Sequence, residues 1–364
     1  MKSKYYNLKN ILKKNAQYNV IFGERSNGKT FAVLKYGLEQ FCNNGKQLAI
    51  VRRWNEDFTG KRGQVMFNAI VSNNLVTKLT AGEWTDIYYY GSRWYLCRYD
   101  PDTGKRILHE KVFAYGFSLS GMEHDKSTAY PDITTIMFDE FLTRSAYIPD
   151  EFILFMNVIS TIIRDRSNVK IFMLGNTVNK YCPYFKEMGL KHIKEMHPGD
   201  IDLYRYGDSE LTVAVEYSAP NKTGKDSDLY FAFDNPKLTM ITGGAWEIAI
   251  YPHLPVKYKP KDILLTFFIE FSGDLLQAEV INTSDLIFIF IHRKTTDLKD
   301  PDNDLIYSPE YDPRPNWHRK ITQPHSAIEK KICNLFKRDK VFYADNETGE
   351  IVRNYLIWCG KAPR

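Results

Sequence analysis

The sequence lacks an apolar run long enough to cross a membrane. A membrane-spanning helix takes about 18 consecutive apolar residues, whereas the longest run here, residues 286–291, has the length of a buried strand. The N-terminal segment is charged, and it lacks the unbroken apolar core and the small-residue cleavage site of a signal peptide. We therefore expect a cytoplasmic protein with no membrane contact.

The sequence also lacks cysteines and histidines at the spacings of metal ligands or redox motifs. Its five cysteines are scattered without a C-x-x-C pair, and no histidine cluster has the spacing of zinc ligands. These absences argue against a disulfide framework and a zinc site. What is present is 364 residues with 43% hydrophobic content, enough to give each of two domains a core. A formal net charge of +5 permits a polyanionic partner without requiring one.

Residues 1–217 alternate predicted strands with predicted helices. This pattern is typical of an α/β domain, in which helices cover both faces of a parallel sheet. The predicted strands of the sheet are residues 18–22, 47–54, 133–138 and 169–177, with a hairpin over residues 84–99 that residues 112–117 extend. The predicted helices are residues 30–41 and a segment that begins near Pro149 and carries its apolar residues on one stripe.

The pattern changes after residue 217. Residues 218–256 are partly polar, contain Pro and Gly, and lack clear periodicity, so we interpret them as a linker. Residues 257–364 predict a small α+β domain. Its expected elements are an antiparallel meander of three strands between residues 263 and 292, a helix over residues 327–336, and two late strands near residues 341–343 and 351–358.

The strongest motif is G-E-R-S-N-G-K-T at residues 23–30, which fits the P-loop pattern G-x-x-x-x-G-K-[ST]. In such a loop, backbone N–H groups around Gly23 and Gly28 wrap a phosphate, Lys29 reaches the β- and γ-phosphates, and the Thr30 hydroxyl binds Mg²⁺. An ordinary glycine-containing turn is the alternative, but here a predicted strand precedes the motif and a helix follows it. We therefore predict that ATP and Mg²⁺ bind here. The remaining loop residues expected to contact nucleotide are Arg25, Ser26 and Asn27.

Polar side chains end two later strands of the predicted sheet. Asp139 and Glu140 follow residues 133–138; in P-loop enzymes a strand-end Asp holds Mg²⁺ and an adjacent Glu accepts a proton from the attacking water. A solvated loop start is the alternative for this pair. Asn176 ends the next strand, where its amide would sense the γ-phosphate or orient the water, or would simply form a turn.

Several cations lie near the expected nucleotide edge of the sheet. Arg164 and Arg166 end the predicted helix, where a cation is also favoured by the helix dipole. The functional interpretation is an arginine finger that reaches the nucleotide of a neighbouring subunit, with Arg164 the first choice. The other cations of interest, each of which has a solvated surface charge as its alternative, are Arg25, Arg52, Arg53 and Lys126.

Five segments together carry a family resemblance. They are YNVIFGERSNGKTFAVLKY, LAIVRRW, KSTAYPDITTIMFDEF, YIPDEFILFMNVISTIIRDR and FMLGNTVNKYCPYF, in that order between residues 18 and 185. In these segments the chain resembles the DNA-packaging ATPases of small tailed phages of the phi29 type. The C-terminal third matches only in position and strand pattern.

The resemblance implies an ATP-driven motor that moves double-stranded DNA into a preformed phage head. Such a motor is a ring of identical subunits, expected to be a pentamer, which lies in the host cytoplasm and binds transiently to the portal of the head; in some relatives a structural packaging RNA joins it. The implied fold is an ASCE, RecA-like ATPase domain followed by a domain resembling a degenerate RNase H-like nuclease.

The resemblance also implies roles for single residues. Lys29 and Thr30 would bind phosphate and Mg²⁺, Asp139 the metal, Glu140 the water, and Arg164 would act on the neighbouring subunit. Lys126 would contact a neighbour or the DNA. A working nuclease needs several converging carboxylates, and the third strand of the C-terminal meander contains none, so we expect no nuclease activity.

Two other classes of protein remain as alternatives. A P-loop GTPase or small-molecule kinase begins with the same loop, but a GTPase would follow its metal-binding Asp with x-x-Gly and carry N-K-x-D. Here Glu-Phe-Leu follows Asp139, and Tyr-Cys follows Asn179 and Lys180. The second alternative is a nucleic-acid-binding scaffold with a relic P-loop, against which the intact Lys29 and Glu140 argue.

Overall fold

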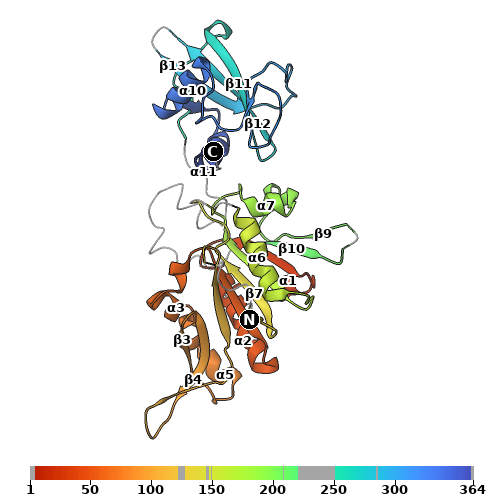
Figure 1. The fold of residues 1–364 in the computed structure, drawn as a ribbon, viewed down its shortest axis with the longest axis vertical. Helices are drawn as coiled ribbons and strands as arrows, with labels where there is room; N and C mark the ends of the chain where they lie inside the picture. The colour runs from red at the N-terminus through yellow and green to blue at the C-terminus, as the bar shows by residue number, and fades with distance from the viewer. Residues whose placement is uncertain are drawn as a thin grey trace. The chain divides into compact units, whose positions relative to one another are not determined.

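The computed structural model describes residues 5–121, 128–144, 147–148, 150–207, 209–219, 251–283 and 286–361. The chain divides into two compact units, Met1–Glu247 and Ile248–Arg364 (Figure 1). Most of the linker expected at residues 218–256 lies outside the described residues, as does Lys126. Among the described residues, no helix has the length and apolar character needed to span a bilayer.

The first unit is built on a mostly parallel sheet, as the sequence predicted. In the described residues the strand order is β3-β4-β6-β2-β7-β8-β1-β10-β9, with β5 paired to β4. The six central strands are parallel: β6 (Ala114–Ser118), β2 (Gln47–Arg52), β7 (Ile133–Asp139), β8 (Lys170–Asn176), β1 (Tyr18–Gly23) and β10 (Thr212–Ser218). The antiparallel additions are β3 (Asp86–Tyr90), β4 (Arg93–Tyr99), β5 (Arg106–Leu108) and β9 (Ile201–Arg205).

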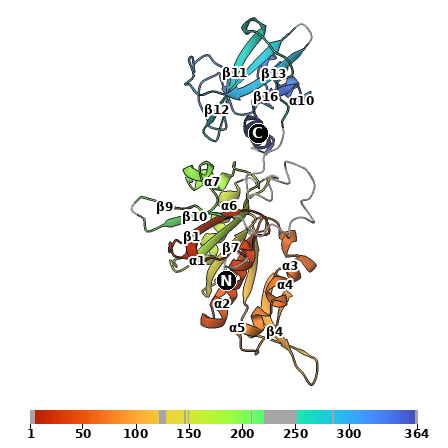
Figure 2. The same ribbon diagram turned by 180° about the vertical axis from the view of Figure 1, so that it is seen from behind.

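Helices cover both faces of this sheet. The longer helices are α2 (Lys29–Asn44) on one face and α6 (Glu151–Ile163) on the other, and their buried residues belong to two separate cores (Figure 2). The shorter segments are α1 (Lys9–Leu12), η1 (Asn55–Phe58), α3 (Lys61–Val65), α4 (Asn68–Ser72), α5 (Leu75–Leu79), α7 (Pro183–Glu187) and η3 (Lys191–Lys194). A sheet covered on both faces has strands that are apolar throughout, and β7 is buried along almost its full length.

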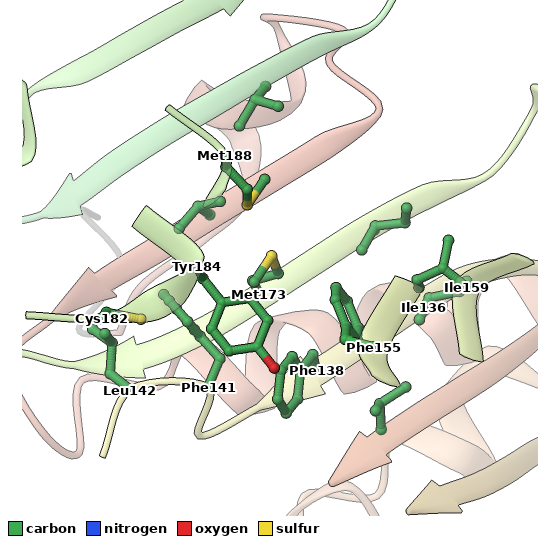
Figure 3. Packing of buried hydrophobic residues seen from close by; sticks show 14 of the residues in the cluster. Ile136, Phe138, Phe141, Leu142, Phe155, Ile159, Met173, Cys182, Tyr184 and Met188 are labelled. Atoms are coloured by element: carbon green, nitrogen blue, oxygen red, sulfur yellow. The ribbon is translucent and has the colours of Figure 1, made fainter. Parts of the chain in front are cut away.

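An aromatic cluster fixes α6 and α7 against the sheet. The Tyr184 ring of α7 packs among Phe138, Phe141 and Phe155 with ring centroids 5.5, 5.9 and 5.8 Å away (Figure 3). All four rings are fully buried. Phe138 and Phe141 flank the carboxylates at the end of β7, so this cluster gives that strand end a rigid support.

The second unit contains a mixed sheet of order β15-β14-β11-β12-β13-β16 in the described residues. The predicted meander is confirmed, because β11 (Ile263–Phe271), β12 (Asp274–Asn282) and β13 (Ile287–Arg293) pair antiparallel. The predicted helix is α10 (Ala327–Lys337). The other elements are η4 (Pro260–Asp262), β14 (Ile306–Tyr307), β15 (Trp317–His318), β16 (Val341–Tyr343) and α11 (Asn346–Lys361).

The last strand predicted from the sequence, residues 351–358, is wrong, because these residues belong to α11. The apolar residues that this part of α11 buries are Ile351, Val352, Tyr355 and, directly after the segment, Cys359. Their spacing places them on one face of a helix, which outweighs the β-branched composition. The Asp345 side chain accepts a hydrogen bond from the backbone N–H of Thr348 at 2.7 Å near the start of this helix, which is a capping signal for a helix.

Candidate functional site: a phosphate loop beside two carboxylates

The glycine-rich loop connects β1 to α2. Gly23 ends the strand with φ +152°, and a Cβ atom at this position would lie only 2.2 Å from Ser218 Oγ. Gly28 precedes the helix with φ +94°, a backbone conformation that side-chain-bearing residues rarely adopt. Glycine is therefore required at both ends of the loop.

Lys29 lies inside the loop, almost completely buried. Its Nζ donates hydrogen bonds to the carbonyl oxygens of Glu24 (2.6 Å) and Gly23 (3.4 Å), and to the Oδ1 atoms of Asn27 (3.2 Å) and Asn176 (3.4 Å). Burial lowers the pKa of Lys29 to about 8, against the opposing attraction of Asp139 and Glu24. The ammonium group is thus bound to neutral oxygens that a phosphate group can replace.

A hydroxyl and a carboxylate lie side by side next to Lys29. Thr30 Oγ1 donates to Asp139 Oδ1 at 3.1 Å, and the other oxygen of Asp139 pairs with the guanidinium of Arg52 at 2.9 Å. Burial raises the pKa of Asp139, and Arg52 and Thr30 oppose that rise. Hydroxyl and carboxylate oxygens are the protein ligands that Mg²⁺ prefers.

Glu140 presents its carboxylate to solvent at the end of β7. Its side chain is 65% exposed, and its Oε2 accepts a hydrogen bond from Arg52 Nη1 at 2.8 Å. The backbone of Glu140 has φ +62°, a left-handed conformation that is uncommon for a residue with a side chain. Arg52, one of the cations that the sequence placed near the nucleotide edge of the sheet, bridges both carboxylates.

Lys29, Thr30, Asp139 and Glu140 line one cleft of about 260 Å³ in the described residues. Most of the residues predicted from the sequence are brought together in it: Ser26, Asn27, Gly28, Lys29, Thr30, Asp139, Glu140 and Asn176. Phe31, Leu174 and Gly175 also line the cleft, and the sequence did not single them out. Arg25 is exposed and lies outside the lining.

Arg164 and Arg166 have different surroundings. The Arg166 guanidinium donates to the carbonyl oxygens of Tyr130, Pro131, Ile133, Ile162 and Ile163. It therefore ties the end of α6 to the segment before β7. Arg164 is exposed, does not line the cleft, and donates to the Thr128 carbonyl oxygen at 3.3 Å.

A family model described as "Podovirus DNA encapsidation protein (Gp16)" matches residues 1–196, which include the whole cleft lining. The chain belongs to this family. The resemblance to phi29-type packaging proteins noted from the sequence is thereby confirmed.

Individual relatives of this Gp16-family chain are phage packaging proteins. The DNA packaging proteins of Bacillus phages PZA and phi29 are each 31% identical over 189 residues, which is 50% of this chain and 50% of the relative. The DNA packaging protein of Bacillus phage B103 is 30% identical over 175 residues, 47% of this chain and 48% of the relative. The chain spans about half the length of these relatives in the match.

Two solved structures are similar over nearly the whole chain. The phi-28 gp11 DNA packaging motor matches with a TM-score of 0.53 and 18% identity, covering 99% of each chain. The bacteriophage phi-29 viral genome packaging motor assembly matches with a TM-score of 0.53 and 22% identity, covering 97% of each chain. At this identity the likeness shows a shared fold.

A second layer of contacts supports the phosphate loop of this Gp16-family chain. Tyr6 donates its backbone N–H to the Asn27 carbonyl oxygen at 2.9 Å and its hydroxyl to Glu216 Oε2 at 2.7 Å. Asn27 Nδ2 donates to Ser218 Oγ at 2.9 Å. The segment before α1 and the end of β10 thus both hold the loop, which the sequence alone did not indicate.

Glu216 makes the free energy of unfolding depend on pH in a way that can be measured. Burial raises the pKa of Glu216, opposed by the hydrogen bond from Tyr6. As pH rises through the window between the unfolded and the raised folded pKa, only the unfolded chain has released this proton, so stability falls. We expect Glu216→Gln, which keeps an acceptor for Tyr6, to gain unfolding free energy relative to wild type as pH rises through this window.

Urea unfolding of both full-length chains between about pH 4 and pH 8 checks this, since the window opens near the ordinary Glu pKa of about 4.3. Tyr6→Phe is the companion variant; it deprives the buried carboxylate of a donor and should cost roughly 1–3 kcal/mol. Parallel pH profiles for wild type and Glu216→Gln would show that Glu216 is not the source of the effect.

Proposed function

We propose that this chain is an ATP-driven translocase that packages double-stranded viral DNA into a preformed phage head. The observation that supports it most is the cleft itself. The cleft brings together a P-loop lysine, a hydroxyl paired with a carboxylate, and a second carboxylate that is exposed. These are the groups that ATP hydrolysis requires. Membership of the DNA encapsidation family supports DNA packaging as the process that this hydrolysis drives.

We propose that the cleft holds the triphosphate of ATP and Mg²⁺. The loop approaches its neighbours so closely that a Cβ at Gly23 would clash, and α2 begins at Lys29 with its N-terminal N–H groups directed to the loop. Thr30 and Asp139 would hold the metal, which neutralises phosphate charge when bound. The loop residues Gly23, Arg25, Ser26, Asn27 and Gly28 would surround the nucleotide.

We assign the chemistry to residues at the ends of neighbouring strands. Glu140 would accept a proton from the attacking water, since its carboxylate is exposed beside Lys29 and Thr30. Asn176 already contacts Lys29 and would sense or orient groups at the γ-phosphate. Arg52, which pairs with Asp139 and Glu140, would have to release both carboxylates before they act.

The strand orders support a finer classification of both units. In the first, β8 lies between β1 and β7, the arrangement of the ASCE, RecA-like ATPases. In the second, the order β16-β13-β12-β11-β14-β15, with β14 parallel to β11, supports our proposal of a likeness to RNase H-like domains. Because β13 carries no carboxylate, we propose that this domain has lost nuclease chemistry and serves as a docking or DNA-gripping module.

We propose that the working form is a homo-oligomeric ring, a pentamer by resemblance, at the portal of the head. Its partners would be double-stranded DNA, the portal, and in some systems a structural packaging RNA. It would act in the host cytoplasm, transiently at the portal vertex. In the ring Arg164 would serve as the finger for a neighbouring subunit, because it is exposed whereas Arg166 is bound to five carbonyl groups.

The test is DNA-stimulated ATP hydrolysis. We expect double-stranded DNA to stimulate phosphate release by the wild type, and Lys29→Ala to abolish the activity because the phosphates lose their buried cation. Lys191→Ala, at an exposed lysine, is the matched control. Hydrolysis of GTP without a response to DNA would favour the GTPase or kinase alternative, and DNA binding without hydrolysis would favour the scaffold.

A further inference from the structure

Arg53, the residue after β2, contacts groups that Arg52 does not reach. Its side chain is 8% exposed and pairs with Glu151 through two hydrogen bonds, Nε to Oε2 and Nη2 to Oε1, both 2.8 Å. Its guanidinium also lies over the Tyr147 ring, 5.2 Å from the centroid. The two neighbouring arginines thus serve different partners.

The remaining donors of Arg53 are directed at the backbone beside the proposed general base. Nη1 donates to the carbonyl oxygen of Glu140 at 3.2 Å, and Nη2 donates to that of Phe141 at 3.0 Å. Glu140 has the left-handed φ described above, and such a conformation persists only where surrounding contacts fix it. Arg53 supplies contacts of this kind.

Both carboxylate oxygens of Glu151 accept hydrogen bonds. Its side chain has no exposed surface, and besides Arg53 it accepts hydrogen bonds from the Ile148 N–H at 2.7 Å and from the Tyr184 hydroxyl at 2.9 Å. A buried ion pair compensates its desolvation only when its geometry and hydrogen bonds are complete, as they are here. Tyr184 is held in turn by the aromatic cluster around Phe138 (Figure 3).

We propose that Arg53 and Glu151 are positioning residues for Glu140. Glu151 fixes the guanidinium of Arg53, and Arg53 holds the carbonyl groups of Glu140 and Phe141, and with them the backbone from which the Glu140 side chain projects. The inference rests on the proposed ATPase function, in which Glu140 activates water. It assigns a catalytic consequence to a buried pair that does not line the cleft.

The test is a double-mutant cycle on the full chain with Arg53→Lys and Glu140→Gln. Lysine keeps the charge but not the paired hydrogen bonds to carbonyl oxygens. We expect Arg53→Lys alone to lower kcat by roughly 10- to 100-fold, the size expected for a misplaced catalytic group, with KM for ATP changed less than threefold. In the Glu140→Gln background the same change should have little further effect on the residual kcat.

The outcomes separate this inference from the proposed function. An equal loss of kcat in both backgrounds would show a merely structural role and overturn the inference, as would an unchanged kcat in Arg53→Lys. A wild type that hydrolyses no ATP would instead overturn the proposed function. If Arg53→Lys does not fold, Glu151→Gln, which keeps one oxygen to accept from the Ile148 N–H but loses the charge that pairs with Arg53, carries the same cycle. Arg205→Lys, at an exposed arginine, is the matched control.

Discussion

Glu140→Gln should lower kcat for ATP hydrolysis by at least about 100-fold, the contribution expected of a general base, while ATP remains bound. Glutamine preserves the size of the side chain and an oxygen for the hydrogen bond from Arg52, but it cannot take a proton from water. Lys29, Thr30 and Asp139 are untouched, so the triphosphate keeps its ligands. Single-turnover hydrolysis and equilibrium binding of ATP measure the two quantities separately.

The matched control is Glu187→Gln, which removes a carboxylate from an exposed position on α7. It should leave hydrolysis within about twofold of wild type, since surface substitutions away from a site have small effects. If Glu140→Gln retained most of the wild-type rate, another group would have to activate the water. If it lost ATP binding instead, Glu140 would be a ligand and not a base.

Arg164→Ala should lower the hydrolysis rate by about 10³-fold or more if its guanidinium neutralises transition-state charge. Because Arg164 lies outside the cleft of its own subunit, the loss should be repairable by a neighbour. Mixing Arg164→Ala subunits with Glu140→Gln subunits creates interfaces that combine an intact Glu140 with an intact Arg164. We therefore expect partial recovery of activity, with a maximum at intermediate mixing ratios.

Two comparisons make the mixing experiment decisive. Arg205→Ala subunits, which lose an exposed arginine on β9, should retain wild-type activity by themselves. Recovery at no mixing ratio, under conditions where mixed rings are shown to form, would contradict action between subunits. Arg166→Ala is unsuitable as a control, because it would free five carbonyl groups that hold the end of α6.

The central sheet and the members of the cleft could be predicted because their signals are local. One continuous apolar strand is followed at once by Asp139 and Glu140, and another runs into the glycine-rich loop. Each pattern places polar groups at the carboxyl end of a strand. Carboxyl ends of parallel strands meet at one edge of a sheet, so the meeting of Lys29, Thr30, Asp139 and Asn176 followed from the strand assignments.

The supporting contacts could not be predicted, because they join residues far apart in the chain. Arg53 and Glu151 are 98 positions apart, and Asn27 and Ser218 are 191 apart. Nothing in the sequence around Glu151 distinguishes a buried acid from one that begins a helix at the surface. The misassigned segment at residues 351–358 failed for another reason, since β-branched residues there obscured a helical spacing.

The hydrogen bond between Asn27 and Ser218 connects the phosphate loop to the end of β10. Ser218 is the last residue of β10, and from there the chain continues toward the second unit. Asn27 belongs to the loop that would grip the nucleotide, and both side chains are buried. A rearrangement of the loop that withdrew Asn27 would leave its buried side-chain amide without this acceptor, so we expect the loop and the end of β10 to move together.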